Sequence, residues 1–190
     1  MSDFEFIFAL YSLLLGLSMV ELLGGLGRAL EVRFAAQAER EAFSIGWLTP
    51  LLAIFVMLDL LSFWSAAWTA RGGLTVSNTV LMGVAGFAAV YFLAARLVFP
   101  SHPEGFANLD VHFFRVRRIV LGLLLVLLGA QLGFYLSQPD LAVSLARPLA
   151  WIMTIVLVVL MAAAMAVNDR RWSIAILAAL ILRYVVIYLL

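Results

Sequence analysis

The sequence has 190 residues, of which 66% are hydrophobic and 12% are charged, and its mean hydropathy is +1.13. Soluble domains carry about 25% charged residues and about half apolar ones, so this composition excludes a water-soluble globular protein. The formal net charge of +1 points to no class of partner, and no nucleic-acid partner is expected.

Two residue types that carry much protein chemistry are missing. The absence of cysteine excludes disulfides, thiolate metal sites, iron–sulfur clusters and covalently attached c-type haem. All twelve basic residues are arginine, so no lysine amine is present to form a Schiff base with retinal or pyridoxal phosphate. We therefore expect no resident cofactor.

Six apolar segments are long enough to cross a hydrocarbon core of about 30 Å. Connectors rich in glycine, proline or charge separate them. The sequence therefore predicts an all-α integral membrane protein, with one transmembrane domain over residues 1–190 that forms a six-helix bundle. The predicted spans are 6–27, 48–70, 76–98, 119–136, 149–167 and 173–190.

The first span follows the acidic start Met1 to Glu5. A signal peptide would begin with a basic region and end at a small-residue cleavage site, so we expect a helix that is retained. The charged segment after this span, as far as Glu41, is interpreted as a solvated continuation of the same helix.

One face of the first span is polar. Tyr11, Ser18 and Glu21 are seven and three residues apart, spacings that place side chains on the same side of a helix. Because polar and small residues mediate contacts between membrane helices, we expect this face to point into the bundle.

Two further charges lie inside spans: Asp59, with Ser62 on its face of the second span, and Arg183 in the last. A charge at a helix centre costs about 2.5 to 3.5 kcal/mol on insertion scales and usually marks a pathway, a pair or a cavity. At 1.5 Å per residue, Asp59 and Arg183 fall about 15 Å deep and Glu21 about 9 Å deep. All three are therefore predicted to form one charged cluster.

Within this cluster we expect Asp59 to pair with Arg183 and Glu21 to act as the proton carrier. The alternative is structural: the Asp59–Arg183 pair would hold helices in register while Glu21 bonds a hydroxyl group. Arg183 could also extend its long side chain to the membrane surface.

The third connector contains both histidines and a basic cluster. Its apolar and basic residues are predicted to form an amphipathic segment on the membrane surface or a docking surface for a partner. The spacing of the histidines matches no metal-ligand signature, so no metal site is expected. The residues in question are His102, His112, Arg115, Arg117 and Arg118.

Arginine distribution predicts the orientation. The first, third and fifth connectors, with the adjoining helix ends, hold nine of the twelve arginines. Basic connectors are retained on the cytoplasmic side, so both termini are predicted to be periplasmic or extracellular in a bacterial-type inner membrane.

The sequence argues against an enzyme, because no span contains a histidine and no serine lies in a nucleophile-elbow context. We expect a channel or transporter for an ion, a proton or a small polar solute. The alternative is a non-catalytic structural, assembly or sensory subunit of a larger membrane complex. The expected partners are the lipid bilayer and either copies of the chain or other membrane subunits.

Overall fold

The computed structural model describes residues 2–39, 43–69, 76–138, 141–142 and 148–189. In these ranges the regular elements are six long helices and one short 3₁₀ helix, η1 (Pro103–Gly105), between the third and fourth helices. The long helices are α1 (Asp3–Glu39), α2 (Leu48–Thr69), α3 (Asn78–Val98), α4 (Leu109–Ser137), α6 (Pro148–Ala166) and α7 (Arg170–Leu189).

Each of the six long helices is long enough and apolar enough to cross a membrane. They fit a multi-pass membrane protein, as the composition predicted. The predicted segments for α2, α3, α6 and α7 begin within three residues of the observed helix starts. The direction in which the termini face stays a prediction.

Two helices extend well beyond the predicted segments. α1 continues to Glu39, which confirms as far as that residue the interpretation of the charged segment as more of the same helix. The last two residues of the predicted continuation, Arg40 and Glu41, lie outside the described residues. α4 begins at Leu109, ten residues before the predicted start. Its start is fixed by Asn108, whose side chain accepts a hydrogen bond from the Asp110 backbone nitrogen at 2.7 Å. The arginine cluster therefore lies in the first turns of a spanning helix.

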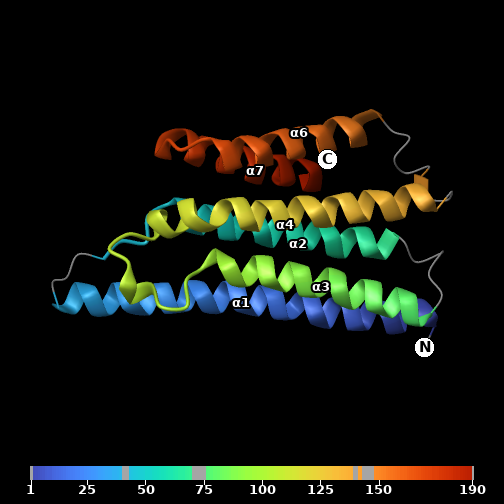
Figure 1. The fold of residues 1–190 in the computed structure, drawn as a ribbon, viewed down its shortest axis with the longest axis horizontal. Helices are drawn as coiled ribbons and strands as arrows, with labels where there is room; N and C mark the ends of the chain where they lie inside the picture. The colour runs from blue at the N-terminus through green and yellow to red at the C-terminus, as the bar shows by residue number, and fades with distance from the viewer. Residues whose placement is uncertain (1, 40–42, 70–75, 139–140, 143–147, 190) are drawn as a thin grey trace.

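The helices are arranged as three stacked pairs (Figure 1). α1 packs against α3 in one outer layer, α2 and α4 form the middle layer, and α6 packs against α7 in the other outer layer. α7 contacts α2 and α6 contacts α4. A residue on the inner part of α2 can therefore reach both outer layers.

The starts of three helices meet at one polar junction. The Asp110 Oδ1 atom accepts a hydrogen bond from the Leu48 backbone nitrogen at 3.0 Å, and Arg170 Nε lies 2.8 Å from Asp110 Oδ2. Gly46 makes room for this carboxylate: its φ is +68°, and a Cβ atom there would overlap Asp110. Asp110 thus ties the starts of α2, α4 and α7 together.

α1 and the end of α3 approach closely at Gly25. A Cβ atom at Gly25 would lie 2.7 Å from side-chain atoms of Phe99, which is almost fully buried. Gly16, on the same helix, has open space around the corresponding position. The two glycines therefore differ in what surrounds them and not in secondary structure.

We predict that Gly25→Ala lowers the free energy of unfolding by about 1 to 3 kcal/mol, because the added methyl group would overlap Phe99. Gly16→Ala is the matched control, and it should leave stability unchanged or raise it by up to about 1 kcal/mol, as alanine favours helices. Unfolding in mixed micelles, followed by circular dichroism, measures both. Equal effects of the two substitutions would contradict the close packing at Gly25.

Candidate functional site

Asp59 lies near the centre of the bundle. It is eleven residues from the start of α2 and ten from its end, which places it about 16 Å and 15 Å from the two helix ends. Only 4% of the residue is exposed. An acidic side chain at this depth is costly unless the protein provides partners for it.

The partners of Asp59 are two tyrosines from the two outer layers. The hydroxyl of Tyr184 on α7 donates to Asp59 Oδ1 at 2.5 Å. The hydroxyl of Tyr91 on α3 lies 3.3 Å from Asp59 Oδ2 and 2.6 Å from the Val56 carbonyl oxygen, both of which accept from it. One carboxylate thus joins α2 to α3 and to α7.

The predicted ion pair between Asp59 and Arg183 is wrong. Arg183 Nε instead donates to the Met153 carbonyl oxygen of α6 at 2.9 Å. Its guanidinium carbon lies 4.8 Å from the centre of the Tyr184 ring. Adjacent residues on a helix point about 100° apart, and here Tyr184 holds the inward position. Arg183 therefore touches the partner of Asp59 and not the carboxylate itself.

Glu21 is also separate from Asp59 and is paired with two arginines, so the prediction of one charged cluster is wrong, while the predicted role of Glu21 as proton carrier stays a prediction. Its Oε1 atom lies 2.6 Å from Arg96 Nη1 and 3.0 Å from Arg28 Nη2. Arg96 also donates to the Ser101 hydroxyl at 3.0 Å. The Glu21 side chain is 22% exposed and pairs near the end of α3. The three predicted charges therefore occupy separate sites.

The inward direction predicted for the polar face of α1 is confirmed by burial. Tyr11 and Ser18 are both buried, and the Ser18 hydroxyl has no hydrogen-bond partner among the described residues. Ser62 on α2 is half-buried. Tyr11 and Ser18 lie about 10 Å apart along α1, and Glu21 is about 5 Å further on. Polar side chains thus follow one another along the face of α1 that points into the bundle.

The residues predicted to form a surface on the third connector have different environments. His102 is exposed, with its Nδ1 atom 3.1 Å from Glu104 Oε1. His112 is half-buried, and its Nε2 atom is hydrogen-bonded to the Leu97 carbonyl oxygen at 3.1 Å. Arg115 is exposed beside the Phe106 ring. Only part of the predicted docking set is therefore accessible.

The prediction that Arg117 belongs to that surface is wrong. It is 2% exposed, and it donates hydrogen bonds to the Val167 carbonyl oxygen and to Asn168 Oδ1, the latter at 2.5 Å. The neighbouring Arg118 is exposed, and its Nε atom donates to the Met165 carbonyl oxygen at 3.3 Å. Carbonyl groups at a helix C-terminus lack intrahelical partners and attract positive charge. The two arginines therefore cap the end of α6.

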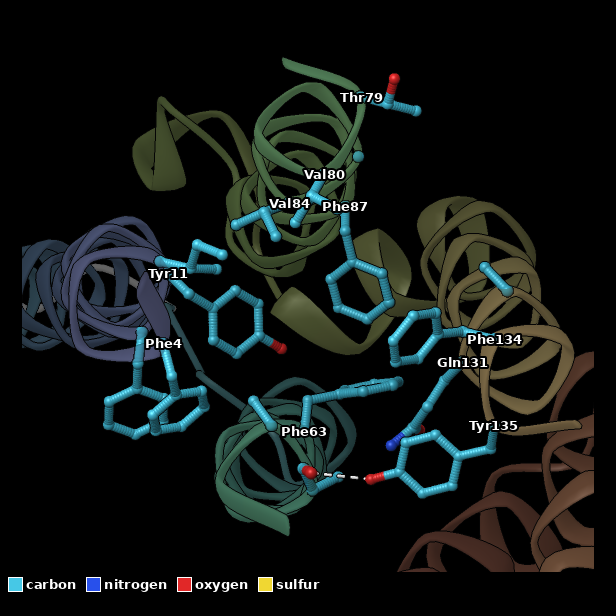
Figure 2. A pocket seen from close by; sticks show the side chains of 16 residues that line it. Phe4, Tyr11, Phe63, Thr79, Val80, Val84, Phe87, Gln131, Phe134 and Tyr135 are labelled. Atoms are coloured by element: carbon cyan, nitrogen blue, oxygen red, sulfur yellow. Dashed lines mark hydrogen bonds between the residues drawn. The ribbon is translucent and has the colours of Figure 1, made fainter. Parts of the chain in front are cut away.

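A cavity of about 410 Å³ lies between α1, α2, α3 and α4, in the half of the bundle that holds the N-terminus (Figure 2). The Tyr11 side chain projects into it from α1 (Figure 2). Tyr11, Phe87 and Phe63 are in ring contact, and Phe63 also contacts Tyr91. These ring contacts connect the cavity lining to Tyr91, which is a hydrogen-bond partner of Asp59.

No group of three or more histidine, aspartate or glutamate side chains that could hold a metal ion occurs within the described ranges.

The chain matches no protein-family model, no curated protein and no solved structure.

No sequence motif identifies Tyr91 and Tyr184 as the partners of Asp59. A weak signal existed, since both are hydroxyl-bearing residues deep in otherwise apolar spans. A tyrosine hydroxyl that is buried usually finds a hydrogen-bond partner. By that rule, a buried carboxylate without an arginine partner is expected to accept hydrogen bonds from buried tyrosine hydroxyls such as these.

We predict that Tyr184→Phe lowers the free energy of unfolding by at least about 1 kcal/mol when Asp59 is present, and by much less in an Asp59→Leu background. The reason is that the hydroxyl loses its acceptor in that background. A four-variant unfolding cycle in mixed micelles measures the coupling.

Tyr188→Phe is the control for this cycle. Tyr188 is one turn further along α7 and is half-exposed, and no hydrogen bond joins it to Asp59. Its coupling to Asp59→Leu should stay below about 0.5 kcal/mol. Additive effects for Tyr184 would show that the hydrogen bond contributes nothing to stability.

Proposed function

We propose that this chain is a multi-pass membrane transport protein in which Asp59 carries protons through the helix bundle. The observation that supports this proposal is a buried carboxylate at mid-depth whose hydrogen bonds come from two neutral hydroxyl groups. No arginine forms an ion pair with it among the described residues.

The physical argument concerns the cost of charge in a medium without water. An isolated ionised carboxylate costs several kcal/mol to bury, whereas the neutral acid costs far less. A carboxyl group with neutral partners can exist in both forms at such a site, while one held by a fixed arginine stays ionised. The environment of Asp59 is of the first kind and that of Glu21 is of the second.

The hydrogen bonds of Tyr91 suit both forms of Asp59. A tyrosine hydroxyl has one proton to donate, and here it lies between two acceptors, the Val56 carbonyl oxygen at 2.6 Å and Asp59 Oδ2 at 3.3 Å. When Asp59 is protonated at Oδ2, it can donate to the Tyr91 oxygen while Tyr91 donates to Val56. No buried donor is then left without an acceptor.

The inner face of α1 offers a route on either side of Asp59. Tyr11 lies on the side of the cavity, and Glu21 lies on the side where α3 ends. Between them, the buried Ser18 hydroxyl has a hydrogen-bonding capacity that no described residue fills. Water bonded to such a group can bridge gaps that side chains leave.

The arginines support the orientation proposed for this protein. Arg96 lies in the last turn of α3, Arg117 near the start of α4 and Arg170 at the start of α7, while Arg28 shares Glu21 with Arg96. These helix ends lie opposite the N-terminus of the chain (Figure 1). With that end on the cytoplasmic side of a bacterial-type inner membrane, the cavity opens in the outer half and the Glu21 pairs lie in the inner half.

We predict that purified protein in liposomes moves protons when a potassium gradient and valinomycin impose a membrane potential. A pH-sensitive dye trapped inside reports the rate. Asp59→Asn should reduce this rate to nearly that of protein-free liposomes, because the amide cannot take up and release a proton.

Two further variants make the result decisive. Tyr188→Phe should retain the wild-type rate, since it leaves the hydrogen bonds of Asp59 intact. If Asp59→Asn does not fold, Tyr184→Phe tests the same site and should slow the rate severalfold. A wild-type rate no greater than that of empty liposomes, or an unchanged rate in folded Asp59→Asn, would overturn the proposal.

A second candidate function is that of a structural, assembly or sensory subunit in a larger membrane complex. It is favoured by two ion pairs that join different helices and hold the bundle together. One is formed by Glu21 with Arg96, and the other by Asp110 with Arg170. In this reading the charges only stabilise the fold, and the accessible part of the third connector, with His102 and Arg115, binds a partner.

Native mass spectrometry of the protein extracted from its own membrane separates the two functions. The transport proposal predicts a monomer or a homo-oligomer. Foreign membrane subunits present in fixed stoichiometry would favour the second candidate.

A further inference from the structure

The cavity between α1, α2, α3 and α4 has the size of a small-molecule site. Its volume of about 410 Å³ falls in the range typical of ligand pockets in proteins. Four helices contribute to its walls, which Figure 2 shows in a view along the bundle. No assigned role in the proton route accounts for a space of this size.

The walls are aromatic and uncharged. None of the described lining residues carries a formal charge. A charged ligand would therefore lose its hydration without gaining a partner of opposite sign. Aromatic rings favour flat, uncharged groups, which they can contact face to face or edge to face. The aromatic lining residues, besides Tyr11, are Phe4, Phe8, Phe63, Phe87, Phe134 and Tyr135.

Three polar side chains in the lining have no hydrogen-bond partner within the described part of the chain: those of Tyr11, Thr79 and Gln131. The Thr79 hydroxyl points away from the cavity (Figure 2). Figure 2 shows the Tyr11 hydroxyl pointing into the cavity from α1 and Gln131 extending into it from α4 on the other side. The Tyr135 hydroxyl differs, because it donates to the Ala66 carbonyl oxygen at 2.7 Å. The cavity therefore has two available hydrogen-bond donors on facing walls.

We infer that this cavity binds an uncharged lipophilic molecule whose flat ring carries two carbonyl oxygens, the chemistry of a quinone. The ring would lie among the phenylalanines, and its carbonyl oxygens would accept hydrogen bonds from Tyr11 and Gln131. A ligand with only an apolar chain could pack against the aromatic walls, but it would leave the donors of Tyr11 and Gln131 unpaired, which weakens binding. This inference stands apart from the proton route, since it concerns binding and needs no transport.

The test is a binding measurement on the full chain in lipid nanodiscs, by isothermal titration calorimetry. The probe is a benzoquinone with a decyl tail, compared with decylbenzene and with dioleoylglycerol. We expect the quinone to bind at least about tenfold more tightly than either comparison compound, because only the quinone offers carbonyl acceptors on a flat ring.

Matched variants assign the binding to this cavity. Tyr11→Phe and Gln131→Leu keep the shape of the walls and remove one donor each, so each should weaken quinone binding about threefold to tenfold. Tyr135→Phe is the control, because its hydroxyl already donates within the protein. It should change the affinity less than twofold.

A second pair of variants tests whether the ligand occupies this cavity. Gly83 lines it, and a Cβ atom there would meet nothing within 4 Å, so Gly83→Phe should fill the space and abolish binding. Gly86 has equally open surroundings but does not line the cavity, so Gly86→Phe should bind as the wild type does.

Three outcomes would overturn the inference. Decylbenzene or dioleoylglycerol could bind as tightly as the quinone, which would make the cavity a slot for lipid chains. Quinone affinity could survive in both Tyr11→Phe and Gln131→Leu. Gly83→Phe and Gly86→Phe could bind alike, which would place the ligand elsewhere. Because the readout is affinity, a failed flux assay would leave this inference standing.

Discussion

The structure depends on the absence of water in the hydrocarbon core. Apolar side chains gain little there by packing against each other instead of lipid, so polar contacts and close packing must specify how helices pair. Asp59 is the deepest example. Its two carboxylate oxygens accept from hydroxyls on α3 and α7, so a single side chain on the middle layer fixes both outer layers. The helix pairs can slide past one another only by breaking these bonds.

The same constraint applies at the end of the bundle, where a charged side chain costs less free energy to bury and ion pairs replace neutral hydrogen bonds. Asp110 joins the starts of α2, α4 and α7, and Arg117 caps α6. Glu21 connects α1 to α3 through Arg96. The bundle is thus held by ion pairs and caps near one membrane surface and by neutral hydrogen bonds at its centre. Among the described residues, this division leaves the carboxylate at mid-depth without an ion pair.

The spans could be predicted because hydrophobicity over about 20 residues is a local property of the sequence. The burial of Tyr11 and Ser18 followed from helical spacing alone. The partners could not be predicted, because depth fixes height along the bundle and not the direction in which a side chain points. Asp59 and Arg183 were placed at one level, yet Tyr184 occupies the inward position. Arg117 was predicted to be a surface residue because the fourth span was predicted to begin at residue 119, after this arginine. The mixed apolar and basic residues around Arg117 hide the true start of the helix at Leu109.

The helices differ greatly in length, and this difference has a consequence for the lipid. α1 has 37 residues and spans about 55 Å, whereas α6 has 19 and spans about 28 Å. Because the last part of α1 is charged, only its apolar residues 6–27, about 33 Å long, match the hydrocarbon core. A thickening bilayer therefore exceeds the reach of α6 before that of α1. The resulting hydrophobic mismatch would act on the hairpin of α6 and α7. Since α7 carries Tyr184, such a mismatch would act on the helix that holds one of the two hydrogen bonds of Asp59.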